Sequence, residues 1–93
     1  METLRFAGHV RDWNPEKPGG LAVADIPAEH VEVFGGLKQQ RVRGRIGDSE
    51  FASNVMPAGG GRLALSVSRA MMKAAGIAIG GEVEFTISAI GRD

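Results

Sequence analysis

"LALSVSRAMMKAAGIAIGGEVEFTI", residues 63–87, repeats the pattern of "AVADIPAEHVEVFGGLKQQRVRGRI", residues 22–46. Residue 22 matches residue 63 and no gap intervenes, so the offset is constant at 41 positions. In each copy a short apolar strand leads into a helix, a glycine ends the helix, and an alternating strand follows. Gly35 and Gly76 hold the same place at the two helix ends. The pattern therefore predicts one structural unit that is present twice.

Each copy is preceded by a further strand. Phe6 matches Phe51 and Val10 matches Val55, so the repeated unit is strand, loop, strand, helix, strand, over about residues 4–46 and 49–87. A unit this short cannot close its own core, so we expect the copies to bury their apolar faces against each other about an approximate two-fold axis. Closure removes exposed strand edges. We therefore predict an α+β fold that is mainly β, a barrel with two short capping helices.

Local signals place the helices and turns. Pro27 suits the first turn of a helix over residues 27–34. Ser68 is a good N-cap for a second helix over residues 69–75, which Gly76 ends. The Gly47-Asp48 pair predicts a tight hairpin turn. "PAGGGR", residues 57–62, reads as a loop, as does "DWNPEKPGG", residues 12–20.

Length and composition exclude several classes of protein. Ninety-three residues suffice for one domain, residues 1–93, with a single modest core. No apolar run approaches the ~18 residues of a membrane span, and charges interrupt any apolar signal core near the start, so we expect a cytoplasmic protein. There is no cysteine and there are only two histidines, so we expect no metal site and no cofactor. Eleven basic and eleven acidic residues cancel, which leaves no global field to attract nucleic acid.

The repeated unit resembles known bacterial proteins. The eight positions from Pro27 to Gly35 and from Ser68 to Gly76, followed by a turn and an alternating strand, are similar to the swapped-hairpin units of bacterial transition-state regulators and antitoxins. The "DIP" strand end, the Trp-containing loop and "MPAGGGR" resemble the domain of unknown function 1905 family from Leu4 to Ile87, although Gly81 stands where a turn aspartate is common. That resemblance implies a double-split β-barrel capped by helices. These are packing and turn motifs and imply no activity.

DNA binding is the first function that the regulator resemblance implies. Those regulators place arginines four and five positions after the helix-start residue, positions that Val31, Glu32, Met72 and Lys73 occupy here. Three of the four carry no positive charge. Without phosphate neutralisation, binding to DNA has no electrostatic basis, so DNA is not the expected partner.

The alternating strand near residue 40 carries an arginine stripe, Arg41, Arg43 and Arg45. Guanidinium groups on one strand face are rigid bidentate donors, which suits a phosphate or an acidic partner. The competing interpretation, which the sequence favours, pairs the stripe across the ladder with Glu82 and Glu84.

A second candidate site combines Trp13 with the glycine-rich loop, Gly59, Gly60, Gly61 and Arg62. Free backbone N–H groups and a guanidinium can hold an anion, and we expect these residues to line a barrel mouth that Trp13 covers. No catalytic residue is assigned, because no nucleophile stands at a spacing that marks a base beside it.

The sequence therefore predicts a non-enzymatic module that binds a protein partner or a small anionic ligand. The alternative is a DNA-binding transcriptional regulator or antitoxin-like protein.

An internal dimer closes its barrel without a second chain, so we expect a monomer without membrane association. Native mass spectrometry of the protein purified from its own host measures the assembly mass and any retained small molecule. A dimeric mass would contradict the expected monomer.

Overall fold

The computed structural model describes residues 3–17, 19–34, 36 and 38–90. Its strands are β1 (Thr3–Asp12), β2 (Ala22–Ile26), β3 (Gln40–Ile46), β4 (Ser49–Gly59), β5 (Arg62–Val67) and β6 (Glu82–Ala89). A 3-10 helix, η1 (Ala28–Phe34), follows β2, and an α-helix, α1 (Arg69–Ala75), follows β5.

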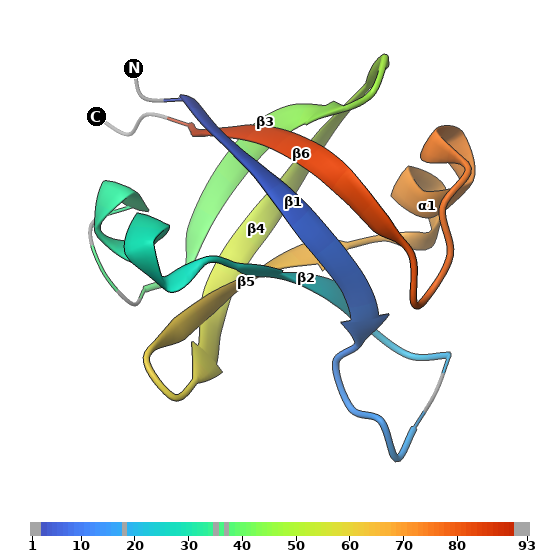
Figure 1. The fold of residues 1–93 in the computed structure, drawn as a ribbon, viewed down its shortest axis with the longest axis horizontal. Coiled ribbons are helices and arrows are strands. Elements are labelled where there is room, and N and C mark those ends of the chain that lie inside the picture. The colour runs from blue at the N-terminus through green and yellow to red at the C-terminus, as the bar shows by residue number, and fades with distance from the viewer. Residues whose placement is uncertain (1–2, 18, 35, 37, 91–93) are drawn as a thin grey trace.

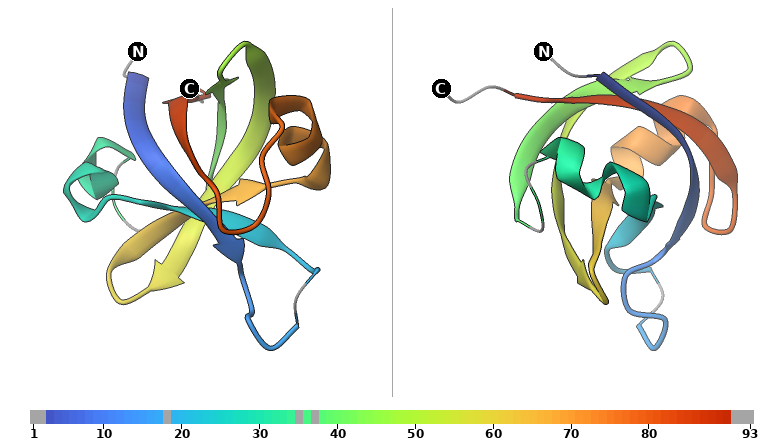
Figure 2. Two further views of the ribbon diagram at one scale, coloured as in Figure 1. Left: turned by 45° about the vertical axis from the view of Figure 1, so that its right-hand side comes forward. Right: turned by 60° about the vertical axis from the view of Figure 1, so that its left-hand side comes forward.

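The six strands form a closed barrel in the order β1-β2-β5-β4-β3-β6, with every neighbouring pair antiparallel (Figures 1 and 2). The predicted β-barrel is confirmed. β6 lies between β1 and β3, so the last strand closes the barrel beside the first. Along β1 exposed and buried residues alternate from Thr3 to Val10, as the period of two in the sequence predicts.

The helix α1 begins and ends where the sequence predicts. Ser68 is its N-cap, and the backbone N–H of Met71 donates to the Ser68 hydroxyl oxygen over 3.1 Å. Gly76 ends the helix with a left-handed φ of 69°. Met71 is buried in the barrel core, so α1 is held by packing as well as by its cap.

The other expected helix, over residues 27–34, is a 3-10 helix instead. Its first turn is closed by the N–H of His30 donating to the carbonyl of Pro27 over 3.0 Å, an i to i+3 bond. β-Branched Val31 and Val33 disfavour a regular α-helix, and Val31 is buried in the core. Gly35, the expected helix end, lies outside the described residues. The described part of the chain therefore has one α-helix, with η1 and α1 on opposite sides of the barrel (Figure 1).

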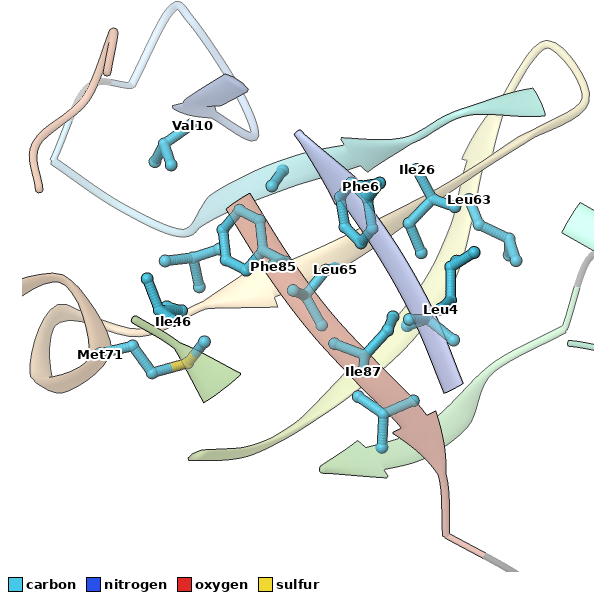
Figure 3. Close-up of a cluster of buried hydrophobic side chains, with 14 of the residues drawn as sticks. Leu4, Phe6, Val10, Ile26, Ile46, Leu63, Leu65, Met71, Phe85 and Ile87 are labelled. Carbon is cyan, nitrogen blue, oxygen red and sulfur yellow. The ribbon is translucent and has the colours of Figure 1, made fainter. Parts of the chain in front are cut away.

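The core is organised around Phe85 on β6, which is fully buried (Figure 3). Its ring stacks on Phe6 with 5.3 Å between ring centroids and meets the edge of Phe51 at 6.4 Å. Gly8 makes room for this ring, since a Cβ there would lie 2.6 Å from Phe85. The aromatic cluster thus joins β1, β4 and β6.

The loop predicted over residues 57–62 is much shorter in the structure. β4 continues to Gly59 and pairs with Arg62 of β5, so only Gly60 and Gly61 form the turn. A register shift between Pro57 and Gly59 explains the difference, because a bulge accommodates a proline that cannot donate to a ladder. The predicted hairpin turn at Gly47 is confirmed, between β3 and β4.

A substitution at Gly44 on β3 tests how closely β3 and β6 must approach to close the barrel. A Cβ at Gly44 would lie 2.0 Å from the backbone oxygen of Thr86, so Gly44→Ala must push two paired strands apart. We expect the free energy of unfolding to fall by about 3 kcal/mol in chemical denaturation. Gly20→Ala is the matched control, because its Cβ meets only an ordinary contact at 3.5 Å, and it should change stability by less than about 0.5 kcal/mol. Equal losses in the two variants would contradict this account of the closure.

Candidate functional site

The arginine stripe lies on the outer face of the barrel. Alternation along β3 points Val42 and Ile46 into the core and leaves Arg41, Arg43 and Arg45 exposed. The three guanidinium groups therefore belong to a solvent-facing surface of the sheet formed by β4, β3 and β6.

The register contradicts the expected pairing of this stripe with Glu82 and Glu84. β3 and β6 do lie side by side, but they run antiparallel, which places Arg43 opposite Ser88 and Arg45 opposite Thr86. The offset of 41 residues matched the strands in the same direction, whereas neighbouring strands here run in opposite directions. The acidic residues of β6 thus lie away from Arg43.

The β4 side of the stripe supplies one acidic partner. Arg45 donates to the carboxylate of Glu50 over 3.1 Å, and both side chains are largely exposed. Arg43 lies opposite Ala52 on this side. Within the described residues, Arg43 has no ion pair. The cross-strand neighbours of Arg43 are Ala52 on β4 and Ser88 on β6. The hydroxyl of Ser88 hydrogen-bonds to the hydroxyl of Thr3 over 3.1 Å.

These side chains line a surface groove of about 620 Å³. Its walls come from β3, β4 and β6, and Ile90 lies at its end: Arg43, Gly44, Arg45, Glu50, Phe51, Ala52, Thr86, Ser88 and Ile90. A volume of this size suits a small ligand. Two guanidinium groups and two hydroxyl groups face the groove with a single carboxylate, so its chemistry favours an anion.

The sequence identified the arginines but missed Thr86, Ser88 and Phe51. Thr86 and Ser88 alternate with buried Phe85 and Ile87 on β6, a pattern typical of any half-buried strand. Only the register between β3 and β6 reveals that their hydroxyl groups adjoin the arginines.

The second predicted site is divided between two places. Trp13 lies at one end of β2, because its backbone N–H donates to the backbone carbonyl of Leu21 over 2.8 Å. Arg62 lies beyond the other end, since its neighbour Leu63 pairs with Ile26, the last residue of β2. Five residues of strand, about 17 Å, separate them. Trp13 is 38% exposed, so the expected buried lid is not formed.

The glycine-rich turn keeps its own residues together. Gly59, Gly60 and Gly61 all have positive φ, which is the backbone requirement that glycine meets most readily. Arg62 adjoins them in the hairpin. Anion binding at this turn stays a prediction.

A half-buried ion pair lies on β1 and β2. Arg11 donates two hydrogen bonds to Asp25, at 2.7 and 2.9 Å. This bidentate contact lowers the pKa of Asp25 below its usual range against the opposing effect of burial, and the charges of Arg11, Arg62 and His9 lower it further. The same hydrogen bonds raise the pKa of Arg11. Both groups are occupied with each other, so we interpret the pair as structural.

Among the residues that the structure describes, no group of three or more histidine, cysteine, aspartate or glutamate side chains is placed to hold a metal ion. Within the same residues no helix has the length and apolar character to cross a membrane.

Comparison with known proteins finds a family. A family model described as a domain of unknown function, DUF1905, matches residues 6–87. No curated protein matches the chain.

The Arg11–Asp25 pair makes stability depend on pH. Because the pKa of Asp25 is lowered in the folded state, its contribution is complete above the usual value of 3.8 and is lost as the pH falls through the folded pKa. We expect Asp25→Asn to reduce the free energy of unfolding at neutral pH by about 1 kcal/mol. In denaturant titrations across pH, the difference from wild type should shrink below pH 3.8. Asp48→Asn makes the same charge change at an exposed turn and should alter the free energy of unfolding at neutral pH by less than about 0.5 kcal/mol.

Proposed function

The chain belongs to the DUF1905 family, a domain of unknown function, and we propose that it is a non-enzymatic module that binds a small anion in the groove beside Arg43. The observation that carries this proposal is the placement of Arg43 between Ala52 and Ser88, without an ion pair in the described part of the chain. A guanidinium in this position can donate two parallel hydrogen bonds to a carboxylate or phosphate.

The hydroxyl groups beside Arg43 add further, uncharged hydrogen-bond donors. Ser88 and Thr86 lie on one strand face, opposite Arg43 and Arg45 respectively. Arg45 is already paired with Glu50, whose carboxylate neutralises its charge. Arg43 is then the residue that carries the binding, and Ser88 is its nearest polar neighbour across the ladder.

We further propose that residues 1–93 form one domain built as an internal dimer, the double-split form of this barrel. Exchanging β1 with β4, β2 with β5 and β3 with β6 leaves the strand order of the barrel unchanged, which supports this. The registers agree: exchange turns the pair Ala22 and Val67 into Leu63 and Ile26, which is also a pair.

The same exchange relates Arg45 to Thr86, which are paired with each other, so the proposed axis passes through the groove. Residues related by this axis carry opposite charges. Arg43 corresponds to Glu84, and Glu50 corresponds to Arg5, so an anion is favoured on the Arg43 side alone. Because the two related halves differ in charge, a ligand with one charged end would bind in a single orientation.

The helices argue against a DNA-binding role. Val31 is buried in the core, and Met72 packs partly against it, so two of the positions that match DNA contacts in regulators face the interior. Lys73 is exposed, and it is the single positive charge among the four matched positions. A phosphate backbone needs several neutralising contacts.

NMR titration of the labelled protein with acetate, benzoate and inorganic phosphate tests the proposal. We expect amide shifts concentrated at residues 43–45 and 86–88, and Arg43→Gln should weaken binding about tenfold, a loss typical of one charged hydrogen bond. Affinity should fall with added salt, because the site is exposed.

The control is Arg41→Gln, on the same strand face but outside the groove lining. It removes the same charge and should leave the affinity within about twofold of wild type, as expected for a screened distant charge. Equal losses in both variants, or an absence of anion-dependent shifts, would refute the Arg43 site.

A further inference from the structure

A second, mainly apolar pocket of about 370 Å³ lies between α1 and the first residues of β4. It is lined by residues of the β3 end, the β4 start and the helix: Ile46, Ser49, Glu50, Phe51, Ala52, Ser68, Ala70, Met71 and Ala74. Glu50 is the single charged residue in this lining, and Arg45 holds its carboxylate. Ser49 and Ser68 are the other polar residues of the lining, and the remaining six residues are apolar.

The walls of this pocket are fixed by contacts with the barrel. The hydroxyl of Ser49 donates to the carbonyl of Ala74 over 3.2 Å, which ties α1 to β4. Met71 anchors the other side of the helix in the core beside Ile46 (Figure 3). Ala70 and Ala74 present only methyl groups between these attachments, so small side chains keep the pocket open.

The apolar pocket adjoins the arginine groove. The two cavities share Glu50, Phe51 and Ala52 in their linings. Along β4, Ala52 lies opposite Arg43 and Ser49 lies opposite Ile46, so the guanidinium and the helix pocket are about 10 Å apart along the strand. Exposed Ala52, on the same sheet face as Arg43, lines both cavities and connects them, whereas the Phe51 ring packs inward against Phe85.

We propose that the ligand is an amphiphilic monocarboxylate, with its carboxylate on Arg43 and its hydrocarbon chain over Ala52 into the pocket beside α1. This inference rests on the proposed anion site and assigns its ligand class. Two arginines and one glutamate line the groove, so its charge matches a single negative charge rather than a doubly charged phosphate. The adjoining apolar surface matches the hydrocarbon chain.

Isothermal titration with acetate, butyrate, hexanoate and octanoate tests the assignment on the intact protein. We expect affinity to rise about fourfold for each added methylene until the pocket is filled, because each methylene leaves water. Octylamine carries a hydrocarbon chain with the opposite charge and should bind much more weakly than octanoate.

Ala70→Leu fills the pocket from the exposed face of α1 and keeps a good helix former. It should abolish the gain with chain length and leave acetate binding unchanged. Ala28→Leu is the matched control, the same substitution at an exposed position of η1, on the opposite side of the barrel, and should retain the wild-type series. Far-ultraviolet circular dichroism verifies that both variants fold.

The outcomes separate this inference from the proposed function. Binding that requires Arg43 but does not depend on chain length would overturn the amphiphilic ligand and leave the anion site intact. Affinity that rises equally with chain length in Arg43→Gln and in Ala70→Leu would overturn the placement of both ends of the ligand. Octylamine binding as tight as octanoate binding would likewise refute a carboxylate at Arg43.

Discussion

The contact of the Phe85 ring with Phe6, Phe51 and Gly8 is the constraint on which the barrel depends. Phe85 comes from β6, Phe6 and Gly8 from β1, and Phe51 from β4. The ring occupies the space over Gly8 that any larger side chain would take, so the spacing of β1 and β6 follows from one aromatic residue and one missing side chain. Packing in this cluster holds the register of the last strand to that of the first, because a slip by one residue would turn Phe85 toward solvent.

The same register creates the groove on the other face of the sheet. Phe85 and Ile87 point inward, so Thr86 and Ser88 must point outward, opposite Arg45 and Arg43. The core and the candidate ligand surface are therefore two sides of one strand alignment. A substitution in the core that shifts β6 would separate the hydroxyl groups from the guanidinium groups without altering either.

Much of the barrel can be predicted from the sequence, and the candidate site largely cannot. Alternation identifies the strands, and Ser68 with Gly76 bounds the helix, because these signals act over a few neighbouring residues. The repeat allows the two strands containing Arg43 and Ser88 to be neighbours, and the structure pairs them. Their direction relative to each other is a tertiary property, and for that reason the expected pairing with Glu82 and Glu84 failed. The 3-10 geometry of η1 and the bulge after Pro57 were missed because the local signals, a β-branched valine and a proline, are weak and fit several backbone geometries.

The position of β6 has a consequence for how the chain reaches its fold. Thr3 pairs with Ser88, so the first strand obtains its closing partner only from residues made some eighty-five positions later. During synthesis, β1 and β3 each present an unpaired edge until β6 has left the ribosome, and such edges promote association with other chains. Contacts between residues so far apart also slow folding, because a long loop must close before they form. Both strands carry exposed positive charges, Arg5 on β1 and the arginines of β3, and charged side chains on an open strand edge disfavour its pairing with another chain.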